Sequence, residues 1–179
     1  DEIINLSNSK NNEKSLYIFP EGVFSNIYFS DLQYYRKLFS ENYSDQDIIV
    51  MGMNTQKYEN NNNKIYNSLL VVDNNLNVLS KYDKIKLVPF GEFLPFENFL
   101  SKLGLKKITQ GYQSFNSGKY NREIISLDLN YFNFIPLICY EIIYSGKINI
   151  SKKNADFIIN ISEDGWFGNS IGLEQHFAH

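Results

Sequence analysis

The sequence predicts an α/β fold, and two observations carry this prediction. Short β-prone runs, rich in Ile, Val, Leu, Tyr and Phe, recur along the 179 residues. A segment with the period of an amphipathic helix lies between the first two of these runs. Strands interleaved with helical segments are typical of α/β proteins.

Each expected element follows from its own residue pattern. The first run is apolar and is closed by Pro20, and the expected helix carries Leu32 and Phe39 on one face. Two buried strands flank the Asn-rich segment 59–64, which predicts a hairpin tip. Residues 122–129 alternate as a half-exposed strand, whereas the last two runs are continuously apolar. The expected strands are 15–19, 47–52, 68–73, a short strand ending at Leu79, 122–129, 132–139 and 155–161, and the expected helix is 31–39.

The composition is that of one globular domain and excludes several classes of protein. Hydrophobic residues make up 43%, aromatic residues 16% and charged residues 21% of the chain. The net charge of -3 leaves no basic surface, so we expect no nucleic-acid partner. A single cysteine excludes an internal disulfide. The longest apolar stretch, 134–143, is interrupted by Pro136 and Glu141 and is too short to span a membrane.

The two ends of the chain suggest a piece of a longer protein. No signal peptide and no apolar strand open the chain, and it stops at His179 within an expected helix. We therefore expect residues 1–179 to form a partial catalytic domain. His176 and His179 have a metal-like spacing, but no third ligand lies nearby in sequence, so we expect no metal.

Three short segments each place a reactive side chain at the exit of a predicted strand. These side chains are Glu21, Lys84 and Cys139, and in α/β proteins such exits are where ligands bind. A thiolate is a strong nucleophile, so Cys139 needs a base such as Glu21 and a nearby cation. Lys84 can lower the pKa of the thiol and can stabilise an oxyanion, together with the backbone N–H of Tyr140. The pattern therefore predicts covalent acyl transfer through Cys139.

The motifs around these residues resemble those of a known superfamily. Phe-Pro-Glu-Gly at 19–22, the long motif at 81–95 and Ile-Cys-Tyr-Glu at 138–141 resemble, in this order, the three catalytic segments of the nitrilase superfamily. The segment 160–170, followed by Gln175-His176, is similar to the apolipoprotein N-acyltransferase branch in particular. The resemblance covers about residues 15–179.

The resemblance implies a fold, a reaction and a location. Members have a nitrilase-like αββα sandwich and a Glu–Lys–Cys triad, which matches Glu21, Lys84 and Cys139, and they use no cofactor. The branch transfers a fatty acyl chain from a phospholipid, through a cysteine thioester, to the N-terminal amine of an apolipoprotein. It acts at the bacterial inner membrane, with the catalytic domain on the periplasmic side and the membrane-spanning segments absent from this chain.

Further site residues are implied by the same resemblance. The predicted binding residues near the triad are Glu92, Tyr140, Glu141 and Trp166. Three segments depart from the usual pattern: Gly22-Val23 stands where Thr-Ala is common, Glu163-Asp164-Gly165 where Asn-Asp-Ala is common, and Leu173 where Pro is usual. None of these changes removes a triad residue.

Three alternatives stay open from the sequence. Lys86 and Lys81 compete with Lys84 as the catalytic lysine, and the motif favours Lys84. A soluble amidase of the same superfamily would transfer the acyl group to water, but such members often have Asp two residues after the cysteine, where this chain has Glu141. A non-catalytic domain of the same fold is the third possibility, since fold alone does not fix function.

Overall fold

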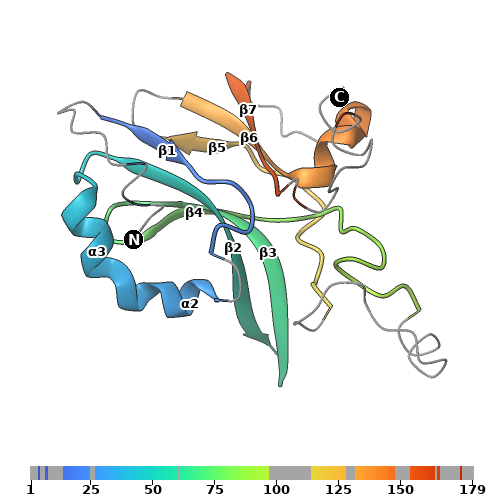
Figure 1. The fold of residues 1–179 in the computed structure, drawn as a ribbon. Helices are drawn as coiled ribbons and strands as arrows, with labels where there is room; N and C mark the ends of the chain where they lie inside the picture. Colours follow the sequence, from blue (N-terminus) through green and yellow to red (C-terminus); the bar gives the residue numbers. More distant parts are fainter. Residues whose placement is uncertain are drawn as a thin grey trace.

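The structure of the chain is a computed structural model that describes residues 4, 7, 14–24, 27–59, 61–96, 114–127, 132–147, 154–163, 165 and 174. Its strands form two sheets, and its longer helical segment follows the first strand (Figure 1). The elements in chain order are β1 (Leu16–Ile18), α2 (Phe29–Leu32), η1 (Gln33–Tyr35), α3 (Arg36–Asn42), β2 (Ile48–Glu59), β3 (Asn62–Val72), β4 (Val78–Asp83), β5 (Ile125–Leu127), β6 (Phe132–Ile138), η3 (Cys139–Lys147) and β7 (Phe157–Ile161).

The first sheet has the strand order β1-β2-β3-β4. β1 runs parallel to β2, and β2, β3 and β4 are antiparallel neighbours. The β2–β3 ladder pairs Ile49 with Val72 at one end and Glu59 with Asn62 at the other. The Asn-rich segment therefore forms the tip of a long hairpin, as the sequence predicts.

Both faces of this sheet are buried, because successive side chains of a strand point to opposite faces. On β2, Ile49 and Met51 face the helices, where they pack with Leu32 and Phe39. Val50 on the same strand faces the second sheet. Figure 1 shows α2 and α3 along one side of the first sheet. A continuous apolar run such as 47–52 is what a strand buried on both faces requires.

The second sheet has the order β5-β6-β7, with β5 antiparallel and β7 parallel to β6. It packs face to face with the first sheet, as Figure 1 shows, through a shared core that includes Val71 of β3 and Phe134 of β6. On its outer face, Ile135 and Leu137 pack with Ile142 of η3. The layers are therefore helix, sheet, sheet and an outer helical segment, which confirms the predicted nitrilase-like α/β fold.

The observed elements differ from the predicted ones mainly at their ends. β2 and β3 continue through polar residues to the hairpin tip, because cross-strand pairing organises residues whose composition resembles a loop. The predicted helix 31–39 is longer and divides into α2, η1 and α3. β6 ends at Ile138, so Cys139 begins the next element. Among the described residues, no helix is long and apolar enough to cross a membrane.

Candidate functional site

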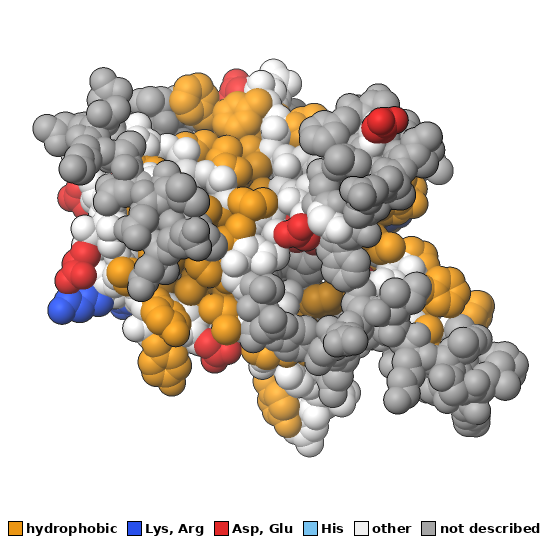
Figure 2. All heavy atoms as spheres, in the orientation of Figure 1, with side chains coloured by type: hydrophobic (Ala, Val, Ile, Leu, Met, Phe, Trp, Pro, Cys, Tyr) orange, Lys and Arg blue, Asp and Glu red, His pale blue; other side chains and the backbone are white. Residues whose placement is uncertain are grey.

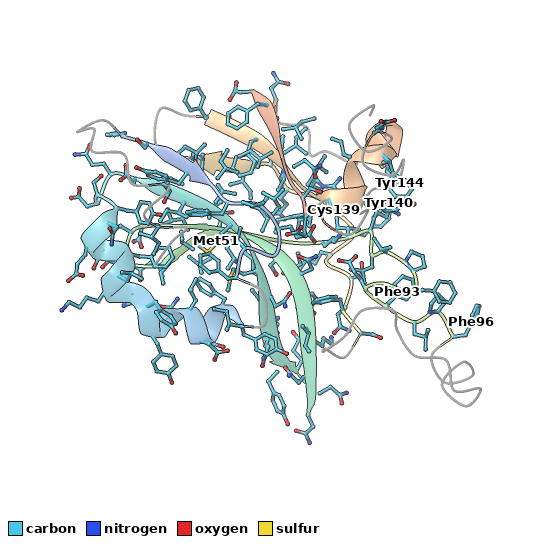
Figure 3. The ribbon with its side chains drawn as sticks, viewed as in Figure 1. Met51, Phe93, Phe96, Cys139, Tyr140 and Tyr144 are labelled. Carbon is cyan, nitrogen blue, oxygen red and sulfur yellow. The ribbon has the colours of Figure 1, made fainter. Side chains whose placement is uncertain are left out.

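The candidate site lies at one end of the space between the two sheets. Glu21 follows β1, Lys84 follows β4 and Cys139 follows β6. Cys139 packs against the core between the sheets. Figure 3 shows Cys139 where β6 meets η3. Strand exits that are far apart in sequence thus meet at this end of the fold.

Lys84 is the buried amine of the site. It is 1% exposed, whereas Lys86 is exposed, so the prediction that Lys84 is the buried lysine is confirmed. Its Nζ atom lies 2.9 Å from Oε1 of Glu92 and 3.6 Å from Oε1 of Glu21. Burial acts to lower the pKa of Lys84, but the two carboxylates outweigh this effect, and the pKa is raised overall. Lys84 is therefore a permanent cation at neutral pH.

Glu92 is a second carboxylate at the site, beside the predicted triad residue Lys84. Its second oxygen accepts the backbone N–H of Val88 at 2.8 Å, which closes the turn after β4 and brings the carboxylate back over Lys84. The chain folds back here because Phe90 adopts a φ of 63°, a left-handed conformation that is unusual for a bulky residue. This local backbone geometry brings Glu92 into contact with Lys84, which lies eight residues earlier in the chain.

Cys139 lies on a sharp turn from strand to helix. Its φ is 51°, in the left-handed region that non-glycine residues seldom adopt. Such strain concentrates at functional sites, and in other enzymes a strained strand-to-helix turn presents the nucleophile. The side chain is partly buried. The conformation of Cys139 is thus an independent sign of function that the sequence does not display.

The electrostatics of Cys139 keep its thiol protonated at rest. Burial raises the pKa of Cys139, and the nearby Glu21 carboxylate raises it further. Lys84, a hydrogen bond with the Ser162 side chain and one with the backbone of Tyr140 act in the opposite direction, but the net pKa is above the ordinary value. Nucleophilic attack by Cys139 therefore requires a base that removes the proton during the reaction.

Glu141 lies beneath the site and ties two strand exits together. Its carboxylate accepts the backbone N–H groups of Ile85 and Lys86, both at 3.0 Å, and that of Ile138 at 3.1 Å. It also accepts the hydroxyl of Tyr82 at 2.8 Å. The side chain is 0% exposed, which favours a positioning role over the substrate contact predicted from the sequence.

Arg122 compensates the buried charge of Glu141. Its Nη2 atom lies 3.1 Å from Oε1 of Glu141 and donates to the Tyr82 hydroxyl at 2.8 Å. Burial is the main reason why the pKa of Tyr82 is raised, so this phenol stays a hydrogen-bond donor. Arg122, Tyr82 and Glu141 form a buried network below the reactive residues.

Tyr140 and Trp166 are the two remaining predicted binding residues. Tyr140 follows the nucleophile, and its ring meets that of Tyr144 edge to face at 5.3 Å (Figure 3). Phe93 and Phe96 belong to a segment that projects from the body of the protein (Figure 3). Figure 2 shows hydrophobic side chains gathered on this projecting part. Trp166 lies outside the described residues.

Besides Arg122 and Tyr82, two further site residues were not predicted from the sequence, Asn67 and Gly52. The Asn67 amide donates to Glu21 at 2.6 Å and to Glu92 at 2.8 Å. A Cβ atom on Gly52 would lie 2.8 Å from the Cα of Glu21, so only glycine lets the Glu21 loop lie this close to β2. A polar residue or a glycine within a buried strand can indicate a functional site. Asn67 did not stand out in the sequence, because Asn is abundant in this chain.

Comparison with known proteins agrees with the nitrilase-like α/β class that the fold defines. The family model for carbon-nitrogen hydrolase matches residues 10–179, so the chain belongs to the carbon-nitrogen hydrolase family. This confirms the superfamily resemblance of the motifs.

Curated relatives are named apolipoprotein N-acyltransferase. The protein of Rhodopseudomonas palustris is 41% identical over 115 residues, which is 63% of this chain and 21% of that protein. The protein of Sinorhizobium fredii is 39% identical over 114 residues, or 64% of this chain and 21% of that protein. The match thus spans about a fifth of the length of these relatives.

Two solved structures share the fold at low sequence identity. A carbon-nitrogen hydrolase from Helicobacter pylori superposes with a TM-score of 0.54 at 16% identity, over 90% of this chain and 52% of that one. A glutamine-dependent NAD+ synthetase from Acinetobacter baumannii gives a TM-score of 0.52 at 21% identity, over 90% of this chain and 28% of that one. These similarities concern the fold alone.

Proposed function

We propose that this chain is the catalytic part of an apolipoprotein N-acyltransferase. The reaction moves a fatty acyl chain from a phospholipid, through a thioester on Cys139, to the N-terminal amine of an apolipoprotein. The observation that carries the proposal is the meeting of Cys139 with Glu21 and Lys84 at one end of the sheets. The names of the curated relatives support this reaction over others in the family.

The first half-reaction acylates the cysteine. Glu21 removes the proton from Sγ of Cys139, and the thiolate attacks the ester carbonyl carbon of the phospholipid. The resulting oxyanion is stabilised by the Lys84 ammonium and by the backbone N–H of Tyr140, each donor contributing about 10²–10³ in rate. Collapse of the intermediate breaks the ester C–O bond, and the lysophospholipid alkoxide takes the proton from Glu21. The products are a thioester and a lysophospholipid.

The second half-reaction transfers the acyl group to an amine. The neutral N-terminal amine of the apolipoprotein attacks the thioester carbonyl, and Glu21 accepts the proton that the nitrogen loses. The C–S bond breaks, and the Cys139 thiolate regains a proton from Glu21. The product is an amide, and the enzyme returns to its resting state without a cofactor.

The cation of Lys84 suits both half-reactions. Each passes through an oxyanion, and a fixed ammonium stabilises such a charge without reorganisation. Glu21 and Glu92 keep Lys84 charged although it is almost fully buried. An exposed lysine such as Lys86 would stabilise an oxyanion less, because solvent and salt screen its charge.

The acceptor separates an acyltransferase from an amidase of the same family. A thioester that waits for a large second substrate must be protected from water, and bulky residues near a site can exclude it. We assign this role to the projecting segment that carries Phe90 and Phe93. Its backbone folds back on itself, with the N–H of Phe90 donating to the carbonyl of Phe93 at 2.8 Å. We propose the same shielding role for Trp166.

The proposed location follows from the reaction. A phospholipid donor and a lipidated acceptor place the enzyme at a membrane, and we propose the periplasmic side of the bacterial inner membrane. Membrane-spanning segments would lie outside this chain.

The experiment uses the full-length protein with a phospholipid donor. Mass spectrometry should show an acyl adduct on the Cys139 peptide, and the Cys139→Ser variant should show none while its melting temperature stays near that of the parent. The adduct should decay slowly in buffer and faster when a lipopeptide with a free amino terminus is added. Fast decay in buffer that the lipopeptide does not change would identify a hydrolase instead.

A further inference from the structure

Asn67 connects the two carboxylates of the site. It lies on β3, it is 7% exposed, and its side chain points to the same face of the sheet as Leu69 in the core between the sheets. Its Nδ2 group donates to Oε1 of Glu21 at 2.6 Å and to Oε1 of Glu92 at 2.8 Å. An amide nitrogen has two hydrogen atoms, so both are used here.

The main chain of Asn67 fixes the lysine as well. Its carbonyl accepts the backbone N–H of Lys84 at 2.8 Å. A single residue thus contacts the base, the second carboxylate and the backbone of the cation. Because β3 pairs along its length with β2 and from Ser68 to Val72 with β4, Asn67 is held by the most extensively paired strand of the described sheets.

The charges of the site show what this connection does. Glu21 and Glu92 both pair with Lys84, so two carboxylates share one ammonium. Two like charges at close range favour uptake of a proton by one of them, whereas N–H donors favour the ionised form of a carboxylate. Asn67 supplies one such donor to each carboxylate.

We propose that Asn67 is a positioning residue that holds Glu21 and Glu92 ionised around Lys84, so that Glu21 is ready to accept the Cys139 proton. This inference rests on the proposed function, because it assigns Glu21 the role of base. The role belongs to a residue of the sheet and not to one of the three catalytic motifs.

The test compares two substitutions in the full-length protein. Asn67→Leu keeps the branched shape of the side chain and removes both donors, and Asn67→Ser keeps one possible donor. The matched control is Asn63→Leu, because Asn63 is exposed on the same face of the same strand. The rate of Cys139 acylation by a phospholipid is measured against pH and donor concentration.

We expect Asn67→Leu to lower the maximal acylation rate by about 10²-fold, because small displacements of reacting groups have effects of this size. The KM for the donor should change little, and the acidic limb of the pH profile should move up by about one pH unit, since one carboxylate then holds a proton at higher pH. Asn67→Ser should change the acylation rate and the acidic limb in the same direction, but by smaller amounts. Asn63→Leu should match the parent.

An acidic limb that stays at the parent's pH in both Asn67 variants would overturn the proposal, even if the rate falls, because a merely structural role lowers the rate without moving the limb. If Asn67→Leu does not fold, the position of the acidic limb in Asn67→Ser decides the proposal. If the parent forms no acyl adduct, the proposed function fails, and ¹³C NMR titration of the Glu21 and Glu92 carboxyl groups decides the inference. One carboxyl group should then protonate at higher pH in Asn67→Ser than in the parent, and unchanged titrations would overturn it.

Discussion

Replacing Glu141 with Gln tests whether the buried network below the site holds it together. The change keeps the size of the side chain and removes its charge. In the native protein, one oxygen lies 3.1 Å from Nη2 of Arg122, and the other accepts the backbone N–H of Ile138 at 3.1 Å. After the change, Arg122 is a buried cation without its carboxylate. The new side-chain amide also has an N–H₂ group where the carboxylate had one of its two accepting oxygens.

The expected loss of stability is large because both partners are buried. The side chains of Arg122 and Glu141 are 7% and 0% exposed. Removing one partner of a buried ion pair typically destabilises a protein by about 3–5 kcal/mol. A donor such as the Ile138 N–H that loses its acceptor contributes about 1–3 kcal/mol, and the two effects overlap. We therefore expect Glu141→Gln to lower the free energy of unfolding by about 3–5 kcal/mol.

Urea unfolding at pH 7 measures this loss. With a slope of about 1–3 kcal/mol per molar urea, the midpoint should fall by about 1–5 M. The control is Glu41→Gln, because Glu41 is 57% exposed and forms a 3.6 Å surface pair with Lys37. The control should change the free energy by no more than about 0.5 kcal/mol. A loss below about 1 kcal/mol for Glu141→Gln would refute the reasoning, because it would mean that the network contributes no more than a surface pair.

Two further predictions concern the reactive residues themselves. Lys84→Met should slow acylation of Cys139 by about 10²–10³-fold, because the oxyanion loses its cation, whereas the exposed Lys86→Met should acylate like the parent. Equal effects at both lysines, measured by mass spectrometry of the adduct, would contradict the assignment. Since burial and then Glu21 raise the pKa of Cys139, its alkylation by iodoacetamide should reach half its maximum at higher pH than that of a free cysteine peptide. Glu21→Gln should lower this midpoint while it abolishes acyl transfer, and an unchanged midpoint would show that the carboxylate does not act on the thiol.

Much of the fold could be predicted from local patterns. The buried runs at 47–52 and 68–73 were predicted as strands because short, continuous apolar runs bounded by turn residues are typical of strands in a sheet covered on both faces. The polar half of the β2–β3 hairpin could not be predicted in the same way. Its residues pair across the hairpin, and this pairing depends on the register between two segments.

The predicted site shows the same division. Glu21, Lys84 and Cys139 could be named from motifs, because each follows a recognisable strand in a recognisable order. Their roles in catalysis stay proposals, and the structure adds the 3.6 Å distance between Lys84 and Glu21 and the electrostatic effect of both on Cys139. Glu141 could be named as well, but its full burial against Arg122 depends on how segments far apart in the chain pack together.

The sequence by itself determined the class of fold and the family, and it singled out the three side chains proposed as reactive, because motifs and hydrophobic period can be read along a chain. Only the tertiary structure decided that Asn67 bridges two carboxylates and that Cys139 takes a left-handed conformation. An asparagine in a strand carries no mark of its partners, since these come from segments more than twenty residues away in either direction. The physical reason is that charge, hydrogen bonding and strain at a site depend on distances that exist only after the two sheets pack.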